Sequence, residues 1–373
     1  MTEIYLVRHG EAEGNVYRRI HGQYDSLLTP NGFQQLKALE RRFADISIDA
    51  CYASDLTRTS LTATAIYKPK NLPLHRDARF REVNLGRWED LPFGYLHRFE
   101  TDAMTQFDYD PAHWWVEDAE RFEEYTDRFL LAMEQLAKEN DGKTIAIVSH
   151  GCVLRGVLLR LFFDPDHPKL PHCDNTAVSH LFYDNGTYTY DFINDNSHLN
   201  PEISTRARQG WWRNGNPVDF NLWFQPLTDA NEFVSACRQI ERITGQNTPE
   251  DRLLGYFLAL RQQGQVHSAM LKDKKIGVVA TRASNREPDA AVLEVLWLDE
   301  AYCGKRYGTQ LLGQAVSDTR RMGKTRLMLQ VNQKNTRAIG FYEHSGFAHT
   351  GRIEGRADQL RMERNLDPAQ YIW

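Results

Sequence analysis

The residues best suited to chemistry are two histidines that each follow a short apolar run. The run at 4–7 leads into Arg8 and His9, the run at 145–148 leads into His150, and a glycine follows each histidine. Unbroken apolar runs closed by glycine are typical of buried strands in a parallel sheet, whose carboxyl ends share one edge. An imidazole can act as a nucleophile or carry protons near neutral pH. The pattern therefore predicts two imidazoles and an arginine at one edge of an α/β sheet.

A third candidate group is the guanidinium of Arg58. Residues 51–54 are predicted to form another strand, and Asp55 is expected to cap the next helix, with Arg58 in its first turn. The amino end of a helix offers free N–H groups and a positive dipole, and an arginine adds a two-pronged donor for phosphate. Taken alone, Arg58 would more often be a surface residue.

Two helices are expected to cover this sheet. One spans 30–44, because Thr29 offers a capping hydroxyl and a proline follows it, and the other spans about 119–138. The side chains expected to face the sheet are Phe33, Leu36, Leu39 and Phe43 from the first helix and Phe122, Phe129, Met133 and Leu136 from the second.

Four motifs stand in a fixed order in the first half of the chain. They are Arg8-His9-Gly10-Glu11 with Asn15, Ser54-Asp55-Leu56-Thr57-Arg58, Glu82 ahead of Gly86-Arg87-Trp88-Glu89, and Ser149-His150-Gly151. In order and spacing they resemble the histidine phosphatase superfamily, which has the phosphoglycerate mutase-like fold. The resemblance covers about residues 1–200, with 174–178 similar to the family's closing strand. It implies a three-layer α/β/α domain.

The same resemblance implies a role for each motif residue. His9 would be the nucleophile that forms a phosphohistidine, which water then hydrolyses, and Glu82 would protonate the leaving oxygen and later activate the water. The groups that would hold the phosphate oxygens are Arg8, Asn15, Arg58 and His150. This mechanism implies neither a metal nor another cofactor for the first domain, and its substrate would be a small-molecule phosphate ester.

Phosphatases and mutases of this superfamily differ between the acid and the second histidine. Cofactor-dependent mutases carry a longer insertion there, whereas only 67 residues separate Glu82 from His150. That spacing favours a phosphatase, and a phosphoglycerate-type mutase remains the alternative. Four aromatic residues in the interval are interpreted either as pocket or as core residues: Phe93, Tyr95, Trp114 and Trp115.

Length and composition set limits on the rest. A chain of 373 residues exceeds what one core usually supports, so two domains are expected. Hydrophobic residues make up 41% and no apolar run reaches the ~18 residues of a membrane span, and the amino terminus lacks a signal-peptide pattern. Five scattered cysteines without a CxxC spacing indicate reduced thiols, no structural disulfide and no zinc site. We therefore expect a cytoplasmic protein.

Charge is distributed unevenly along the chain. Residues 1–200 carry 21 Lys and Arg against 31 Asp and Glu, whereas residues 201–373 carry 24 against 19. An acidic first half disfavours nucleic acid as a partner. The mildly basic second half fits either an anionic cofactor or an ordinary solvated surface.

The boundary between the domains is predicted at 201–219, a polar, turn-rich segment. The first domain would then span 1–200 and the second 220–373. Trp211 and Trp212 lie inside this linker and would pack one domain on the other.

The second half changes to a different order of elements. Residues 222–224 lead into a helix near 229–243, the segments 276–280 and 291–298 are predicted as neighbouring strands, and 327–331 as another. The turn at 303–308 precedes a helix that opens at Thr309. A glycine-bearing loop before a helix can present N–H groups to a pyrophosphate, and it can equally be a structural turn.

The pattern that follows is more specific. Asn335, Ala338, Tyr342 and Gly346-Phe347 stand at the spacing Asn-x-x-Ala-x-x-x-Tyr-x-x-x-Gly-Phe. Over roughly 220–368 the chain thereby resembles the GNAT-type N-acetyltransferases, which implies a mixed-sheet α+β domain that uses acetyl-CoA and a primary amine. By that resemblance Tyr342 would protonate the leaving thiolate. The residues that would bind the cofactor are Leu296, Leu298, Gly304, Lys305, Arg306, Gly308, Thr309 and Asn335.

The cofactor loop departs from the family pattern at two positions. Cys303 stands where the family has Arg or Gln, and Arg306 stands where it has Gly. The side chain of Arg306 would either crowd the phosphates or neutralise them. For the base that receives the amine proton, Glu294 is the strand-borne candidate, with Asp299 and Glu300 as alternatives.

The sequence thus predicts a bifunctional enzyme without a membrane or nucleic-acid partner. A metal-independent phosphomonoesterase would be joined to an acetyl-CoA-dependent N-acetyltransferase. Two alternatives remain: a phosphoglycerate-type mutase in the first half, and a second half that senses acyl-CoA or binds a partner without catalysis.

Overall fold

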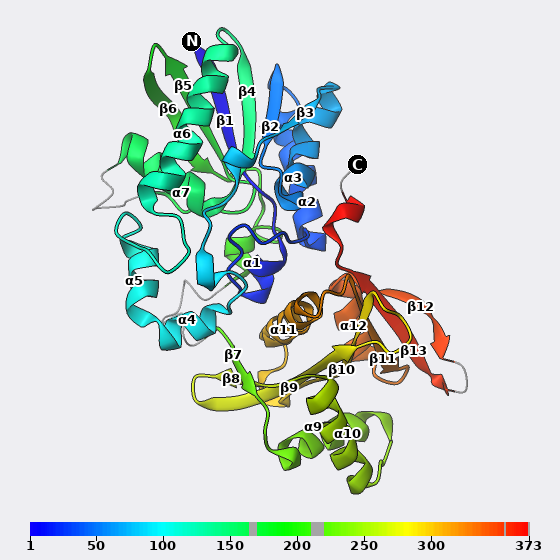
Figure 1. The fold of residues 1–373 in the computed structure, drawn as a ribbon. Helices are drawn as coiled ribbons and strands as arrows, with labels where there is room; N and C mark the ends of the chain where they lie inside the picture. The colour runs from blue at the N-terminus through cyan, green and yellow to red at the C-terminus, as the bar shows by residue number, and fades with distance from the viewer. Residues whose placement is uncertain (164–169, 210–219, 354–355, 372–373) are drawn as a thin grey trace.

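Two α/β domains follow one another along the chain, each built on a mixed sheet with helices on its faces (Figure 1). The computed structural model describes residues 1–163, 170–209, 220–353 and 356–371. The predicted packing of Trp211 and Trp212 therefore lies outside the described residues. All five cysteines are free thiols.

The first domain is organised around a six-stranded sheet of order β3-β2-β4-β1-β5-β6. Its strands are β1 (Thr2–Arg8), β2 (Ala50–Ala53), β3 (Leu74–Arg76), β4 (Thr144–Ser149), β5 (Val178–Asp184) and β6 (Thr187–Asp195). β1, β2, β3 and β4 run parallel to one another. β5 pairs antiparallel with β1, and β6 pairs antiparallel with β5. β1 and β4 lie side by side, with Arg8 paired to Ser149, so the residues that follow them emerge at the same edge.

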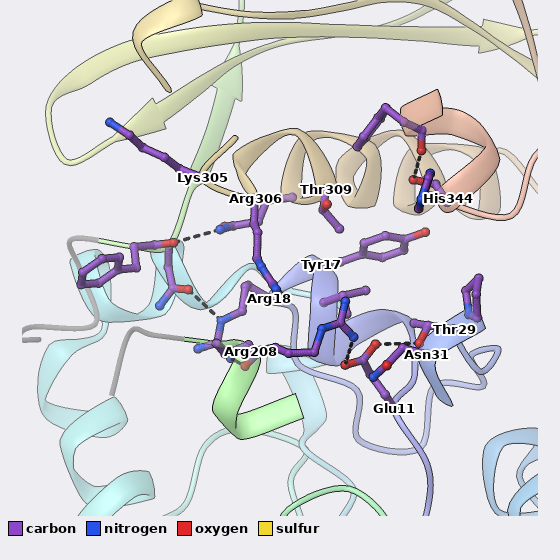
Figure 2. Close-up of a pocket in the computed structure, with 18 of the residues that line it drawn as sticks. Glu11, Tyr17, Arg18, Thr29, Asn31, Arg208, Lys305, Arg306, Thr309 and His344 are labelled. Carbon is purple, nitrogen blue, oxygen red and sulfur yellow. Dashed lines mark hydrogen bonds and ion pairs between the residues drawn. The ribbon is translucent and has the colours of Figure 1, made fainter. Parts of the chain in front are cut away.

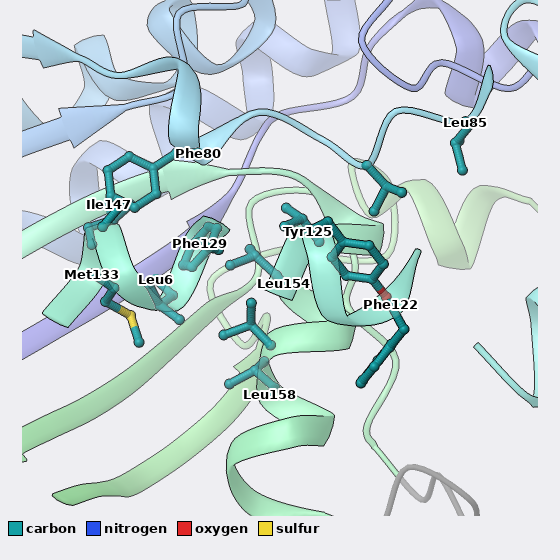
Figure 3. Packing of buried hydrophobic residues seen from close by; sticks show 14 of the residues in the cluster. Leu6, Phe80, Leu85, Phe122, Tyr125, Phe129, Met133, Ile147, Leu154 and Leu158 are labelled. Atoms are coloured by element: carbon teal, nitrogen blue, oxygen red, sulfur yellow. The ribbon is translucent and has the colours of Figure 1, made fainter. Parts of the chain in front are cut away.

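Helices cover both faces of this sheet. They are α1 (Glu13–Tyr17), α2 (Pro30–Phe43), α3 (Thr57–Tyr67), α4 (Phe93–Phe99), α5 (Thr101–Tyr109), α6 (Phe122–Glu139), α7 (Gly151–Phe162) and α8 (Thr205–Arg208). One face packs against α2 and α3, and the other against α6 and α7. Figure 3 shows the second of these cores, in which Leu6 and Ile147 of the sheet meet Phe129, Met133 and Leu158. The three-layer α/β/α prediction is confirmed.

Two details of the expected helices are wrong. Phe33 is 40% exposed rather than facing the sheet, although the other three predicted side chains of α2 are buried. Asp55 does not cap α3, because its carboxylate accepts hydrogen bonds of 2.7 and 2.6 Å from Arg81. The first turn of α3 is instead held by Asp25, which accepts the Thr57 N–H at 2.9 Å from a distant loop.

The second domain contains a seven-stranded sheet of order β12-β13-β11-β10-β9-β8-β7. Its strands are β7 (Trp223–Pro226), β8 (Gly264–Leu271), β9 (Lys274–Ala283), β10 (Ala290–Leu298), β11 (Arg326–Asn332), β12 (Ala348–Ile353) and β13 (Arg356–Asn365). All neighbours are antiparallel except β10 and β11, which are parallel. The predicted strands at 276–280, 291–298 and 327–331 lie within β9, β10 and β11, which form its centre.

Four helices flank this second sheet. They are α9 (Ala230–Thr244), α10 (Glu250–Gln263), α11 (Tyr307–Arg321) and α12 (Thr336–His344). α9 and α10 pack on one face through a core that includes Phe233 and Phe257, and α11 covers the opposite face through Leu312 and Val316. α11 begins two residues earlier than the predicted start at Thr309. It is the helix that faces the first domain (Figure 1).

The contact between the domains is close and largely polar. α1 packs on α11, where a methyl group on Gly313 would lie only 2.5 Å from Cβ of Tyr17. Beside this contact, the buried carboxylate of Glu13 binds Arg364 at 2.5 Å and Arg320 at 2.9 Å. Burial by itself would raise the pKa of Glu13, but the two arginines outweigh it and hold the pKa below its usual value.

A second polar cluster extends this interface. Arg19 of the first domain binds Asp90 at 2.8 Å and donates to Gln314 and Ser317 of α11 at 2.9 and 3.0 Å. At the far end of the second domain, a short 3-10 turn (Pro368–Tyr371) returns to α3. The segment that follows His9 is therefore held in place by the second domain as well as by its own.

Candidate active sites

The first site lies where β1 and β4 end. His9 and His150 both follow these strands, and their rings lie in edge contact with centroids 5.3 Å apart. His9 borders a cavity of about 200 Å³ that is also lined by Arg8, Asn15 and Glu82. His150 belongs to this cluster through the ring contact. The structure thus brings together the histidines that the sequence assigns to one sheet edge.

The hydrogen bond of His9 fixes how its ring can react. Nδ1 lies 2.7 Å from the carbonyl oxygen of Gly10, so Nδ1 carries the proton and Nε2 keeps its lone pair. Burial lowers the pKa of His9 well below the usual value, and the charges of Arg58 and Arg8 lower it further. The imidazole is therefore neutral and nucleophilic at physiological pH.

Arg58 is fully buried and approaches this cavity from α3. Its Nη1 and Nη2 donate to the carbonyl oxygens of Tyr24 and Gly22 at 2.9 and 2.8 Å, and Arg8 donates to the carbonyl oxygen of Cys173. The Nε atoms of both arginines and both ring nitrogens of His150 have no hydrogen-bond partner among the residues that the structure describes. Buried polar groups without partners are costly, and a bound phosphate would satisfy them.

Glu82 lies on the other side of the cavity, at the start of α7. Its Oε1 accepts the Val153 N–H at 2.7 Å and its Oε2 accepts the Cys152 N–H at 3.1 Å. These two residues directly follow His150 and Gly151, so the position of Glu82 depends on the same strand end. The carboxyl group thereby lies beside the predicted nucleophile and phosphate ligands.

Asn15 belongs to α1 and reaches the cavity from the interface side. Its Oδ1 accepts the Ala12 N–H at 2.9 Å and the side-chain amide of Asn175 at 3.2 Å. Because the oxygen is occupied by two donors, the amide nitrogen is the end left to donate to a ligand. Asn15 is thus oriented so that its amide nitrogen could donate to a ligand in the cavity.

Several lining residues were missed by the sequence reasoning. They are His21, His172, Asp174, Asn175, Thr205 and Arg206. His21 is held by the Gly14 N–H, inside a segment interpreted only as a loop. Thr205 and Arg206 lie within the predicted linker, yet this stretch contacts the first domain: the Thr205 hydroxyl donates to Glu11 at 2.9 Å, and the Arg206 N–H donates to Asp174 at 3.2 Å. The contacts are non-local, so no periodicity marks them.

The four aromatic residues that the sequence leaves open as either pocket or core residues differ in their positions. Phe93 lines the first-domain cavity. Trp114 is buried and packs against Trp88 at 5.2 Å between centroids, whereas Tyr95 and Trp115 are exposed. Only Phe93 among them therefore borders the site.

The second candidate site begins at a divergence in the second sheet. The parallel pairing of β10 and β11 ends at Leu293 and Leu329, although β10 continues to Leu298. Leu296 and Leu298 pair with β9 on one side, and within the described part of the chain no strand pairs with their other side. This open backbone edge suits the extended amide arm of a cofactor.

The loop that follows β10 turns back beneath this opening. Gly304 and Arg306 both have positive φ, 77° and 67°, so the loop curls tightly before α11. Lys305 donates to the Ala301 carbonyl oxygen at 3.0 Å, and Lys305, Arg306 and Thr309 line a cavity of about 530 Å³ between the domains (Figure 2). Asn335 is placed elsewhere: its side chain caps α12 by accepting the Ala338 N–H at 3.1 Å.

Tyr342 and Glu294 lie in different surroundings. Tyr342 is buried beside Phe341 and Phe347, and burial raises the pKa of its phenol, so it stays protonated at neutral pH. Glu294 binds Arg282 at 2.6 Å and accepts the Tyr256 hydroxyl at 2.5 Å, facing α10. The two side chains therefore approach the β10 region from opposite faces of the sheet.

Among the described residues, no group of three or more His, Cys, Asp or Glu side chains could hold a metal ion. No helix within the same residues is long and apolar enough to cross a membrane.

Comparison with known families divides the chain in the same way. A family model described as histidine phosphatase superfamily (branch 1) matches residues 4–196. A second, described as acetyltransferase (GNAT) family, matches residues 232–347. The first match spans more than half of the chain and covers most of the first domain, and the second covers the central strands β8 to β11 of the second sheet.

Individual proteins resemble the first half. A Serratia proteamaculans protein named probable phosphoglycerate mutase GpmB is 33% identical over 184 residues, which is 48% of this chain and 86% of that protein. Its namesake from Escherichia coli O1:K1 / APEC is 34% identical over 154 residues, 41% of this chain and 72% of its own. The solved structure of Bacillus stearothermophilus YhfR matches with a TM-score of 0.51 and 32% identity, covering 53% of this chain and 99% of that one.

Proposed function

The chain belongs to the histidine phosphatase superfamily and carries a GNAT acetyltransferase domain, and on this basis we propose that its first domain is a phosphomonoesterase acting through a phosphohistidine. The observation that carries the proposal is the state of His9. Its Nδ1 is bound to the Gly10 carbonyl oxygen, which leaves the Nε2 lone pair free in a ring that experiences the charges of the buried Arg58 and of Arg8.

The first step transfers the phosphoryl group to the enzyme. Nε2 of His9 attacks phosphorus, the P–N bond forms, and the bond from phosphorus to the ester oxygen breaks. The Glu82 carboxyl group gives its proton to the departing oxygen. Arg8 and Arg58 neutralise the charge on the phosphate oxygens and His150 donates a hydrogen bond to them, since their Nε or ring nitrogen atoms otherwise lack partners within the described chain.

The second step returns the enzyme to its starting state. Water attacks phosphorus, the P–N bond breaks, and the Glu82 carboxylate takes the proton of the water. Inorganic phosphate leaves, and Glu82 is again protonated for the next substrate. Because Glu82 is held by the Cys152 and Val153 N–H groups, it keeps the same position in both steps.

The test of this proposal is phosphate release from a panel of phosphorylated metabolites, with chelator present. His9→Ala should lower turnover by more than about 10³-fold, because the nucleophile is removed. The matched control is His75→Ala, an exposed histidine on β3, which should retain full activity. Comparable activity in wild type and His9→Ala would refute the proposal.

A mutase is the second candidate, and the names of the relatives from Serratia and Escherichia favour it. A mutase would use the same His9 but return the phosphoryl group to a sugar-acid isomer instead of water. It would therefore interconvert phosphoglycerate isomers and release little phosphate. A phosphatase releases phosphate in proportion to the substrate consumed, so one assay separates the two.

For the second domain we propose acetyl transfer from acetyl-CoA to a primary amine. The residues present fit this cofactor: β10 has an open backbone edge at Leu296 and Leu298, and a basic cavity follows at Lys305 and Arg306. Acetyl-CoA supplies an acetyl group on a thiol that leaves readily. Gly304, Gly308 and Thr309 border the phosphates in this arrangement, and Asn335 would contribute by fixing the start of α12.

Two side chains would move the protons of this reaction. Glu294 receives a proton from the attacking amine, and Tyr342 gives its phenolic proton to the leaving thiolate. The raised pKa of Tyr342 supports that role, because a phenol that stays protonated can serve as an acid. Asp299 is a weaker candidate for the base, since its carboxylate caps a 3-10 turn through the Ala301 N–H.

Thiol release from acetyl-CoA in the presence of an amine panel tests this second proposal. Tyr342→Phe should slow transfer by about 10²-fold at neutral pH without loss of acetyl-CoA binding. If the wild type binds acetyl-CoA and releases no thiol with any amine, the second domain is instead a sensor of acyl-CoA.

A further inference from the structure

The cavity of about 530 Å³ that contains Lys305 and Arg306 is lined by residues of both domains. Its size falls within the range of small-molecule sites. The first domain contributes Glu11, the start of α2 and Arg208, and the second contributes the loop before α11 and the end of α12 (Figure 2). Neither domain encloses this space alone.

Cations dominate the lining of this cavity. Among the described lining residues five are Lys or Arg, whereas Glu11 is the one carboxylate; the cations are Arg18, Arg208, Lys305, Arg306 and Arg364. Arg364 is neutralised by Glu13, and Glu11 already accepts the hydroxyls of Thr29 and Thr205 at 2.7 and 2.9 Å. Among the lining residues that the structure describes, positive charges therefore outnumber negative ones.

Arg208 and Arg306 face this space from opposite domains. Arg208 lies 3.6 Å from Glu11, and its buried Nη1 has no hydrogen-bond partner in the described chain. Burial lowers the pKa of Arg306, the nearby charge of Arg208 lowers it further, and the Glu11 carboxylate raises it. Glu11 offsets only one of these two like charges, so an anionic ligand beside Arg208 and Arg306 would be stabilised by the remaining positive charge.

We propose that this interdomain cavity binds the phosphate-bearing nucleotide end of acetyl-CoA, with Arg208 and Arg306 on either side of it. The inference rests on the acetyltransferase function proposed above and adds a contribution from the first domain. The cavity is lined by Lys305, Arg306 and Thr309, which belong to the loop and helix start that follow β10 along the chain, and by the end of α12. A ligand extended along the open edge of β10 toward Leu298 would therefore reach this loop next.

The position of the cavity also gives the two active sites a shared wall. Arg18 and Gln209 line both this cavity and the one that contains His9. Arg18 donates to Asn221 at 2.9 Å, which ties the wall to the start of the second domain. A ligand that moves Arg18 from one side therefore changes the lining of the other.

The experiment is calorimetric titration of the full chain with acetyl-CoA and with acetyl-pantetheine, which lacks the nucleotide. Arg208→Met and Arg306→Met should each weaken acetyl-CoA binding by roughly 10- to 100-fold, because each removes charged donors to phosphate. Neither variant should change acetyl-pantetheine binding. The matched control is Arg286→Met, an exposed arginine in the β9–β10 turn, which should bind both as the wild type does.

Two failures of this experiment are distinguishable. If the wild type does not bind acetyl-CoA, the acetyltransferase function itself is refuted. If the wild type binds it and Arg208→Met binds equally well, the function stands and the contribution of the first domain is refuted. Unchanged thermal unfolding of Arg208→Met would show that a loss of affinity is local, and Arg306→Met provides an independent test from the other wall.

Discussion

The cavity at His9 and the cavity at Arg306 adjoin each other but are built in different ways. The first is formed largely by one domain, and its reactive groups are buried at the ends of two neighbouring strands. The second lies between the domains, and its charged groups come from both sides. A site inside one fold can be encoded in local motifs, whereas a site between folds depends on how they are joined.

The interface makes this contrast less simple. α1 follows the proposed nucleophile His9 and carries Asn15, yet it is fixed by α11 through Glu13 and Tyr17. The first site therefore depends on the second domain for the position of one of its walls. The predictions below measure how far each site depends on the other domain.

The largest effect is expected at Glu82, which tests whether the first site is complete in itself. Glu82→Gln should lower kcat by about 10²- to 10⁴-fold, because the amide cannot donate or accept the catalytic proton. The loss should be smaller for esters with acidic leaving groups, which need no protonation. Steady-state kinetics on alkyl and nitrophenyl phosphates would measure this difference, and an equal loss on both would contradict an acid role.

The next effect concerns the buried charge at the interface. Glu13→Gln leaves Arg320 and Arg364 without their carboxylate and should destabilise the chain by about 3–5 kcal/mol. It should also raise KM for the phosphate ester, since Asn15 lies two residues further along α1. The control is Glu134→Gln, whose partner Lys138 is exposed, and it should leave the denaturation midpoint unchanged.

The sign of the pH dependence follows from the lowered pKa of Glu13. A carboxyl group whose pKa is lowered in the folded state stabilises that state at pH values above its unfolded pKa of about 4.5. This contribution to the free energy of unfolding is lost as the pH falls through the pKa of the folded state. The difference in stability between wild type and Glu13→Gln should therefore be full at pH 7 and shrink below about pH 4.5. A difference independent of pH would show that the ion pair is not its cause.

Coupling between the cavities should be weaker than either of these effects. Because Arg18 and Gln209 line both, saturating acetyl-CoA should change KM for the phosphate ester by about 5-fold. Binding linkage is reciprocal, so the phosphate ester should shift the Kd of acetyl-CoA by the same factor. If neither shift is found, the shared wall is rigid and the two sites are independent.

The smallest effect is a displacement of the pH profile. Burial, with the charges of Arg58 and Arg8, keeps the pKa of His9 well below 6.5, so the neutral nucleophile persists as pH falls through that value. When kcat/KM is calculated from the concentration of the dianionic form of the substrate and plotted against pH, its decrease on the acidic side should accordingly lie below pH 6.5. A decrease at or above pH 6.5 would indicate an exposed imidazole.

The first site was largely predictable because its residues follow buried strands. An apolar run ending in His-Gly specifies both the strand and the edge, so His9 and His150 could be paired from sequence alone. Arg58 was placed in the first turn of α3, although the capping group was assigned to Asp55 when Asp25 supplies it from a distant loop. Local patterns locate an element more reliably than they identify its partners.

The interface could not be predicted, for the same physical reason. Glu13 and Arg364 lie 351 positions apart and meet only once both domains are folded. No periodicity connects them, and each alone looks like an ordinary surface charge. The segment at 201–209 was likewise interpreted as part of a linker, although Thr205 binds Glu11 beside the first site.

The most direct test of the central claim is to trap the enzyme during turnover with a substrate that carries radiolabelled phosphorus. Rapid quenching in base and peptide mapping should find the label on the peptide that contains His9, stable in base and lost in acid, as expected for a phosphoramidate. The label should be absent from His9→Ala and should accumulate in Glu82→Gln, which cannot activate water. Label on another residue, or full turnover without any labelled enzyme, would contradict nucleophilic catalysis by His9.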